Sequence, residues 1–288
     1  MSLALPPGTR VPDRTVWLNG RLVSGVDAAL SVHDRGARNG GGIFETLRCA
    51  GGRPLEWQRH MERLVLSAAE LGFPVPPGPA ILHTAVAELL AALKLTDAVV
   101  RITVTRGIAG GRPTRTGCWV EAEPLSGRLW KGTRAGAGTA VILPHAFSPG
   151  WIGRHKTTSR LAWDLAREFA RAEGVDETLL IDRDGFLLEG GASNVFAVID
   201  GSLRTPPLGR DVLPGIARAI VLQLCGDLAI DCRASDVTAD ELSRADQVFV
   251  TNSVQEVLPL AALQGRVLPS RSLGERLRAA YRERARSL

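Results

Sequence analysis

The chain has 288 residues, of which 45% are hydrophobic and 23% are charged, and its formal net charge is +5 at pH 7. A chain of this length can bury a substantial core in one large domain or in two domains of ordinary size. Its basic residues are scattered among acidic ones and only 5% of its residues are aromatic, which disfavours binding to nucleic acids.

The start of the chain and its cysteines indicate a reduced, cytoplasmic protein. The segment MSLALPPGTRVPDR has neither a cationic start nor a sustained apolar run, so it does not predict a signal peptide. No apolar stretch is long enough to cross a bilayer. The four cysteines show no C-x-x-C spacing, which favours packed thiols over disulfides or a metal site.

The first part of the chain alternates strand signals with helix signals. A hairpin is predicted at residues 15–23, where Asn19-Gly20 forms the turn. A second pair of extended arms surrounds Gly51-Gly52. Apolar residues then recur at helical spacing, which predicts two helices. Two predicted strands follow and end at residue 124. The segments are helices at 57–73 and 80–95 and strands at 98–107 and 117–124.

Residues 125–136 have weak periodicity and many turn formers, which predicts a linker between one domain at 1–124 and another at 137–288. In the second domain, hairpins are interrupted by helices, a pattern that favours an α+β fold over a doubly wound sheet. The predicted segments are strands at 139–144, 177–190, 193–205 and 247–252 and helices at 160–174, 214–224 and 273–285.

Lys156 is the first candidate functional residue. The chain has 35 basic residues of the Lys and Arg types, yet its lysines are only Lys94, Lys131 and Lys156. An amine can lose its proton and attack a carbonyl, whereas a guanidinium cannot. Apolar neighbours such as Trp151 and Ile152 could desolvate the amine and lower its pKa. From spacing alone, a solvated loop lysine is the commoner occurrence of this pattern.

Two glycine-containing turns carry the next candidates. Glu189 precedes Gly190-Gly191, and its carboxylate could cap the backbone or accept a hydrogen bond from a protonated heterocyclic nitrogen. Pro214-Gly215 opens a predicted helix and leaves the amides of Ile216 and Ala217 free. Free amides at a helix start can hold a phosphate, although many helices begin this way.

A polar strand end and a pair of arginines on one helix complete the anion-binding candidates. Asn252 and Ser253 end a predicted strand and suit phosphate oxygens, or form an ordinary polar turn. Arg59 and Arg63 lie on one face of a predicted helix, where a solvated pair is the default interpretation.

Arg106 and Arg112 lie at and beyond a strand end, in a glycine-rich segment. They could capture a carboxylate in a bidentate manner, or could belong to a surface hairpin.

Taken in order, these patterns resemble those of the class IV aminotransferases, the fold-type IV family of pyridoxal 5′-phosphate (PLP) enzymes. The resemblance covers nearly the whole chain. It implies an α+β fold with a smaller N-terminal α/β domain, a larger C-terminal pseudo-barrel domain, the cofactor between them, and a homodimer. The matching motifs are LNGRLV, DRGARNGGGIFETLR, RHMERL, HKTTSRL, EGGASNVF, TPPLGRDVLPGIAR and TNSVQEVLPL.

The resemblance also implies roles for individual residues. Lys156 matches the Schiff-base lysine and Glu189 the partner of the pyridine nitrogen. The positions that match phosphate ligands are Arg63, Ile216, Ala217 and Ser253. The family usually has threonine at the position of Ala217, so one hydrogen bond is lost, worth about 1.5–3 kcal/mol if its acceptor is charged. We expect the cofactor still to bind.

The reaction implied is transfer of an amino group from an amino donor to a 2-oxo acid, with a D-amino acid or related amine as donor. Arg160, four residues after Lys156, instead matches some aminodeoxychorismate lyases. A catalytically inactive binding homologue is a third, remote interpretation, which intact Lys156 and Glu189 disfavour.

Candidate substrate-binding residues are Arg106, Arg112, Arg160 and Asn252. The R-x-H clamp of D-amino-acid transaminases is incomplete, because Thr114 stands where histidine is expected after Arg112. The tyrosines of the branched-chain pattern are also lacking, since the one tyrosine is Tyr281.

Overall fold

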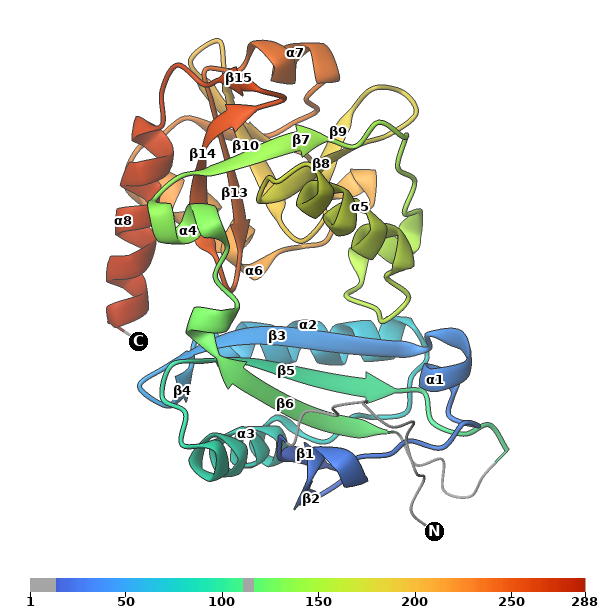
Figure 1. The fold of residues 1–288 in the computed structure, drawn as a ribbon. Coiled ribbons are helices and arrows are strands. Elements are labelled where there is room, and N and C mark those ends of the chain that lie inside the picture. Colours follow the sequence, from blue (N-terminus) through green and yellow to red (C-terminus); the bar gives the residue numbers. More distant parts are fainter. Residues whose placement is uncertain (1–13, 111–116, 288) are drawn as a thin grey trace.

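The structure, a computed structural model, describes residues 14–110 and 117–287. It contains two β-sheets that lie one above the other, each with its own helices (Figure 1). The predicted α+β fold with two domains is therefore confirmed. The N-terminal domain holds the smaller sheet and the C-terminal domain the larger, curled one.

The first sheet has six strands in the order β2-β1-β6-β5-β3-β4, and its pairings are antiparallel. Asn19 and Gly20 both have positive φ between β1 and β2, which confirms the predicted hairpin. The strands are β1 (Val16–Leu18), β2 (Arg21–Val23), β3 (Gly42–Ala50), β4 (Arg53–Pro54), β5 (Ala98–Thr105) and β6 (Cys118–Pro124); the helices are η1 (Gly25–Asp27), α1 (Arg35–Asn39), α2 (Trp57–Glu70) and α3 (Pro79–Leu93).

Strand β3 presents different side chains to its two faces. Ile43 and Leu47 belong to the apolar core that joins the sheet to α2 and α3. Glu45 points to this same side, where it contacts residues of α2. Phe44 and Thr46 face the space between the two domains. Because successive residues of a strand point to opposite sides, one strand supplies both the core and a wall of that space.

The second sheet runs in the order β12-β11-β10-β13-β14-β7-β8-β9, with β15 paired to β14. It is mixed, since β7 pairs in parallel with β14 and β8, whereas β10, β13 and β14 are antiparallel. The strands are β7 (Gly138–Ile142), β8 (Glu177–Ile181), β9 (Leu187–Gly190), β10 (Asn194–Ile199), β11 (Ser202–Thr205), β12 (Cys232–Ala234), β13 (Gln247–Asn252), β14 (Glu256–Leu263) and β15 (Arg266–Val267).

Helices cover the second sheet and contribute two separate apolar clusters to it. In one cluster, Phe196 of β10 and Phe249 of β13 are fully buried and stack with 4.9 Å between ring centroids. Residues of α6 and α8 pack around them. The helices of this domain are η3 (Trp151–Arg154), α5 (Leu161–Ala172), η4 (Leu208–Arg210), α6 (Ile216–Asp227), α7 (Ala239–Arg244) and α8 (Ser272–Arg286).

The segment predicted as a linker, residues 125–136, contains two short helices, η2 (Leu125–Gly127) and α4 (Lys131–Ala135). It connects β6 of the first sheet to β7 of the second. Asp176 accepts hydrogen bonds from Gly132 N at 2.8 Å and Thr139 N at 3.0 Å, which fixes this connection to the second domain. The domain boundaries at 124 and 137 stay a prediction.

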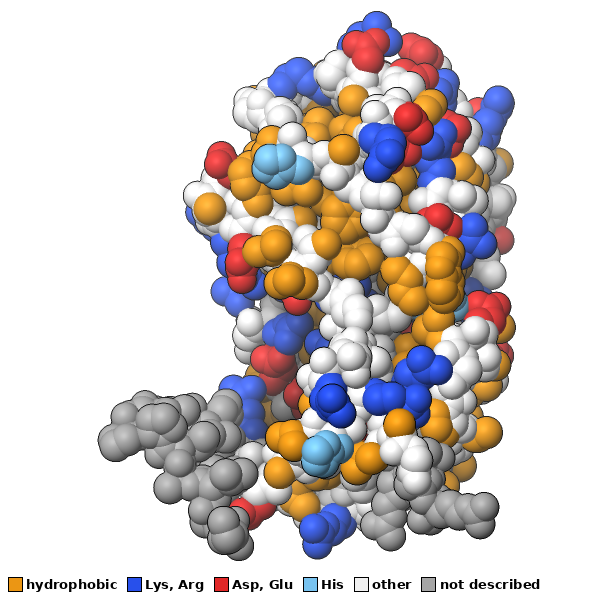
Figure 2. Space-filling view, turned by 90° about the vertical axis from the view of Figure 1, so that its right-hand side faces the viewer, with side chains coloured by type: hydrophobic (Ala, Val, Ile, Leu, Met, Phe, Trp, Pro, Cys, Tyr) orange, Lys and Arg blue, Asp and Glu red, His pale blue; other side chains and the backbone are white. Residues whose placement is uncertain are grey.

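Hydrophobic side chains gather on the face of the second domain that carries α5 (Figure 2). Trp151, Leu161 and Leu165 are the large apolar residues exposed on η3 and α5, with 63%, 73% and 55% of their surface accessible. Within the described residues, none of the helices combines the length and apolar character needed to span a bilayer.

The stacked rings of Phe196 and Phe249 should contribute to the stability of the second domain. Replacing Phe196 by Ala should lower the free energy of unfolding by about 3–5 kcal/mol, because it leaves a cavity between β10 and β13. Urea denaturation followed by circular dichroism measures this change. Val75→Ala, at a position 92% exposed, is the control and should change stability by less than about 0.5 kcal/mol. Equal effects of the two substitutions would contradict the assigned core.

Candidate active site

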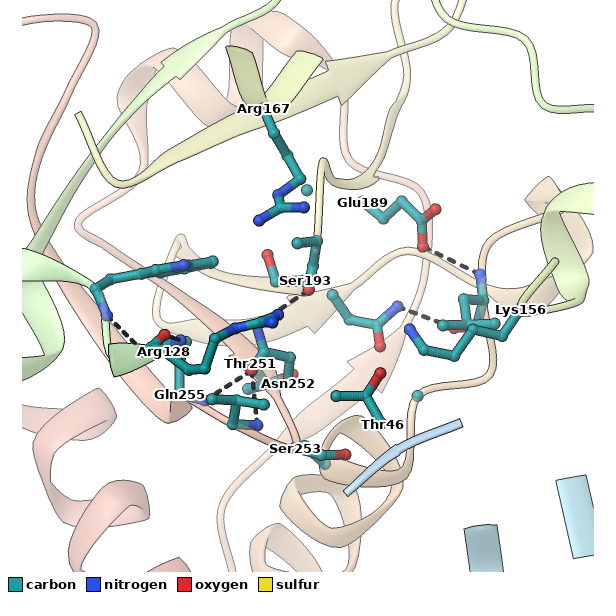
Figure 3. Close-up of a pocket in the computed structure, with 18 of the residues that line it drawn as sticks. Thr46, Arg128, Lys156, Arg167, Glu189, Ser193, Thr251, Asn252, Ser253 and Gln255 are labelled. Carbon is teal, nitrogen blue, oxygen red and sulfur yellow. Dashed lines mark hydrogen bonds between the residues drawn. The ribbon is translucent and has the colours of Figure 1, made fainter. Parts of the chain in front are cut away.

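A cavity of about 810 Å³ lies between the two domains (Figure 3). Its walls come from β3 and β5 of the first domain, from the connecting segment, and from loops of the second domain. Eight of the candidate residues line it: Arg63, Lys156, Arg160, Glu189, Ile216, Ala217, Asn252 and Ser253. Arg106 is not among its lining residues, and Arg112 lies outside the described residues.

Lys156 is held at the cavity by strand-like pairing with the first domain. Phe44 N donates to Lys156 O at 2.8 Å, and Thr158 N donates to Gly42 O at 2.8 Å. Between them, Thr157 and Ile43 form an isolated antiparallel bridge. The segment that carries Lys156 belongs to the second domain, so these bonds join the two domains at the lysine itself.

The amine of Lys156 is surrounded by positive charge and apolar surface. Its Nζ lies 4.8 Å from the centroid of the Phe44 ring. Burial is the largest influence on this group, and the charges of Arg160 and Arg63 add to it, so that the pKa of Lys156 falls to about 7. A substantial fraction of the protein therefore carries a neutral, nucleophilic Lys156 amine at neutral pH.

Glu189 is the residue before the last in β9, and its side chain is buried, with 5% of the residue exposed. Trp163 Nε1 donates to Glu189 Oε1 at 3.0 Å, and Leu213 N donates to Oε2 at 3.1 Å. Burial raises the pKa of Glu189, against the effect of these two hydrogen bonds. A cationic N–H donor in the cavity would favour the ionised form of this carboxylate.

The N-terminus of α6 opens on the cavity, where Gly215 is the N-cap residue and Ile216 and Ala217 start the helix. Within residues 14–110 and 117–287, no side chain caps this end. A Cβ atom at Gly215 would lie 1.8 Å from Asn194 Oδ1, so any other residue here would displace the Asn194 side chain. The first helical amides are thus available to an anion, assisted by the helix dipole.

The turn between β13 and β14 forms another wall. Asn252 Oδ1 accepts from Val254 N at 2.9 Å and Gln255 N at 2.7 Å, and Asn252 Nδ2 donates to Ala192 O at 3.0 Å. The Asn252 side chain is thus engaged in shaping the turn that presents Ser253. Thr251 Oγ1 is buried and has no hydrogen-bond partner among the described residues.

Arg63 is fixed by a buried carboxylate that the sequence patterns did not single out. Its Nε and Nη2 donate to Glu45 Oε1 and Oε2 at 2.8 and 2.6 Å, and its Nη1 donates to Pro214 O at 2.9 Å. His60 Nδ1 lies 2.7 Å from Glu45 Oε2. The one sequence signal for this group is an acidic residue on the helix-facing side of an otherwise apolar strand.

Five arginines line the cavity besides Arg63, and we call four of them the arginine cluster: Arg101, Arg128, Arg160 and Arg167; the fifth is Arg171. The guanidinium of Arg101 lies 3.8 Å from the centroid of the Phe44 ring. That of Arg160 lies 5.1 Å from the Trp163 ring, and its Nη2 donates to Gly191 O at 3.2 Å. Burial lowers the pKa of both Arg101 and Arg160. Of these four, the sequence patterns identify only Arg160.

Arg106 points away from the cavity. Its Nη2 donates to Gly72 O at 3.3 Å, and its guanidinium lies 5.5 Å from the Phe73 ring. A strand end alone does not define the direction of a side chain, so the predicted pairing with a substrate carboxylate does not fit this arrangement.

The donor set fits PLP, the cofactor that the motifs imply. The amine of Lys156 could react with its aldehyde, and Glu189 could accept from its protonated ring nitrogen. Arg63 and the amides of Ile216 and Ala217 could hold its phosphate. The buried Thr251 hydroxyl is a polar group that a ligand in the cavity could satisfy. Among the described residues, no group of acidic, histidine and cysteine side chains is arranged to hold a metal ion.

Comparison with known proteins gives a consistent result. The family model for class IV amino-transferases matches residues 42–263. A putative branched-chain-amino-acid aminotransferase of Methanocaldococcus jannaschii is 33% identical over 90% of this chain and 91% of its own length. A D-alanine aminotransferase of Bacillus licheniformis is 30% identical over 90% and 92%.

The solved structures agree. The branched-chain aminotransferase of the thermophilic archaeon Thermoproteus uzoniensis, crystallised with norvaline, superposes with a TM-score of 0.84. It is 29% identical, and the match covers 94% of each chain.

The lowered pKa of Lys156 predicts selective reactivity. Labelling with an aldehyde and borohydride should rise through pH 7 and level off by about pH 8.5, because the neutral amine is the reactive form. Peptide mass spectrometry resolves Lys156 from the exposed Lys94 and Lys131, which serve as internal references for the reagent. Arg160→Met, which removes a neighbouring positive charge, should move the midpoint to higher pH. A midpoint near the usual lysine value of about 10.4 would contradict the assignment.

Proposed function

The chain belongs to the class IV aminotransferase family, and we propose that its amino donor is an acidic amino acid and that Lys156 is the covalent anchor of PLP. Enzymes of this family are PLP-dependent and carry out transamination. The substrate class and the roles of individual residues rest on the geometry of the cavity.

The catalytic roles follow from the protonation states of the chain's own groups. When bound, PLP supplies an aldehyde for the donor amine and a ring that accepts electrons. Lys156 Nζ, largely neutral above about pH 7, accepts the proton from the substrate Cα and later donates it again. Glu189 holds a proton at the ring nitrogen. Arg63 and the amides of Ile216 and Ala217 orient the phosphate, with Ser253 beside it, so that the reacting carbon lies near Lys156.

The arginine cluster is the observation that carries the substrate proposal. The α-carboxylate of an amino acid needs one guanidinium, whereas four face this part of the cavity. Three of the four have an acidic neighbour: Arg128 lies 2.5 Å from Glu123, Arg167 3.7 Å from Asp164 and Arg101 3.8 Å from Glu121. Among the described residues, Arg160 forms no ion pair, and its side chain donates instead to Gly191 O. A second carboxylate on the substrate would offset the cost of burying this charge.

Aminodeoxychorismate lyase activity is the second candidate, because Arg160 lies on the cavity wall four residues after Lys156. The same cluster would suit a substrate with two carboxylates that eliminates a group beyond Cα. Such a reaction would yield pyruvate and 4-aminobenzoate. An inactive binding homologue remains disfavoured by the presence of Lys156 and Glu189 in one cavity.

Three further parts of the proposal concern stereochemistry, assembly and location. The D-alanine aminotransferase relative supports a D-configured donor. The exposed Trp151, Leu161 and Leu165 offer an apolar surface that a second copy could cover in a homodimer. A cytoplasmic location is supported by the cysteines, because free thiols are typical of a reducing compartment. The free thiols are Cys49, Cys118, Cys225 and Cys232.

Covalent attachment is tested by absorbance. The purified protein with PLP should show a visible band that borohydride removes, and Lys156→Ala should lose the band. Arg244→Met, on exposed α7, is the control and should keep it. A wild-type protein that never develops the band would contradict the anchoring role of Lys156.

Substrate class is tested by donor kinetics. Acidic donors should give a higher kcat/KM than leucine or alanine, with both enantiomers of each tried. Arg101→Met should lower kcat/KM for acidic donors by about 10–100-fold, the equivalent of one charged hydrogen bond, and leave apolar donors nearly unchanged. Equal losses for all donors would remove Arg101 from the recognition of the side chain. Release of pyruvate from aminodeoxychorismate, without transamination of any donor, would favour the lyase.

A further inference from the structure

Glu45 and His60 form a buried group beneath the cavity that the proposed chemistry does not use. Both are 1% exposed. Glu45 lies on the helix-facing side of β3, and His60 lies on α2. An ionised carboxylate in such a place is costly unless it is fully paired. Three donors meet it here, two from Arg63 and one from His60.

These contacts fix the protonation states of the group. Arg63 and His60 outweigh the effect of burial and lower the pKa of Glu45 to about 2, so Glu45 is ionised and can only accept. His60 Nδ1 must then carry the proton and donate to Glu45 Oε2. Burial lowers the pKa of His60, so its ring is neutral and Nε2 has no proton. Ser253 Oγ, 3.3 Å from Nε2, therefore donates to it.

Glu45, His60 and Arg63, which belong to the first domain, contact the second domain at two places. Through Arg63, Glu45 reaches Pro214 O, one residue before the N-cap of α6. Through His60, it reaches Ser253 in the turn between β13 and β14. Arg63 has five N–H groups and three of them are bonded in this way, so two remain for a ligand.

We propose that Glu45 and His60 are positioning residues of the active site: Glu45 orients the Arg63 guanidinium toward one anionic group held between the domains, and His60 fixes Ser253 and its turn beside that group. The inference rests on the proposed binding of PLP, whose phosphate is that group. Because the Ser253 proton is committed to His60, Ser253 donates no hydrogen bond to the anion. The donors that meet the anion are then Arg63 and backbone amides.

The test compares two aldehydes that differ by the phosphate, PLP and pyridoxal. Each is titrated into the apoprotein and its binding is followed by the visible absorbance band. In the wild-type protein PLP should bind far more tightly than pyridoxal. Glu45→Gln leaves one oxygen for the three donors of Arg63 and His60, so the Arg63 pair loses its bidentate geometry. The ratio of the two affinities should fall about tenfold or more, through weaker binding of PLP and not of pyridoxal.

A double-mutant cycle shows whether Glu45 acts through Arg63. Arg63→Met alone should lower the affinity ratio, and Glu45→Gln in that background should lower it no further. His60→Asn keeps an amide donor toward Glu45 and removes the acceptor that fixes Ser253. The turn beside the anion is then held less firmly, and we expect a smaller fall of about threefold. This variant also tests the proposal if Glu45→Gln does not fold.

Glu256→Gln is the matched control. Glu256 is a carboxylate of similar burial, 4% exposed, that also joins the domains through Arg48 at 2.5 Å and Arg282 at 2.7 Å. It does not line the cavity. This variant should lower the thermal stability as Glu45→Gln does, yet leave the affinity ratio within about twofold of the wild type.

Several outcomes would overturn the proposal. An unchanged affinity ratio in Glu45→Gln, a fully additive double mutant, or an equal fall in Glu256→Gln would each assign Glu45 a purely structural role. A wild-type protein that forms no band with either aldehyde would overturn the proposed function itself and this role with it. The two failures are distinguishable because the first occurs in a protein that does form the band.

Discussion

Backbone pairing between residues 156–158 and the start of β3 is the constraint on which the candidate site depends. Phe44 N donates to Lys156 O, and Thr158 N donates to Gly42 O. These bonds place a lysine of the second domain against an aromatic ring of the first. A separate contact, from Arg63 Nη1 to Pro214 O at 2.9 Å, joins α2 to the segment just before α6. A cavity at a domain interface is thereby made from rigid parts.

The charged side chains that line this cavity form two groups. Near α6, Arg63 is paired with Glu45, so its charge is balanced before any ligand arrives. The other group, the arginine cluster, carries charge that Glu121, Glu123 and Asp164 balance only in part. Both Arg160 and Arg63 oppose the protonation of Lys156. One arrangement therefore accounts for the lowered pKa of the amine and underlies the proposal of an acidic substrate.

Sequence patterns find residues whose function is tied to a local turn and miss those that act across elements. Glu189, Ile216, Ala217 and Ser253 each lie next to a glycine or a strand end, and the structure brings them to one cavity. Arg101 and Glu45 lie in the middle of strands, where their partners come from distant parts of the chain.

The same distinction between local and long-range information applies to the fold. The hairpin at Asn19-Gly20 is readable because the turn demands positive φ. The parallel pairing of β7 with β14 and β8 joins segments far apart in the chain. Local patterns do not contain this information. For the same reason Arg106, at a strand end, was expected near a substrate and lies instead against Phe73.

The two faces of β3 also limit how such an enzyme can change during evolution. Phe44 and Thr46 face the cavity, while Glu45 faces the buried side. Deleting or inserting one residue in this strand would exchange the faces, placing the carboxylate in the cavity and the aromatic ring against α2. New substrate preferences can therefore arise here by substitution at alternate positions. A change in the length of this strand would instead require new residues in the core and in the cavity wall at the same time.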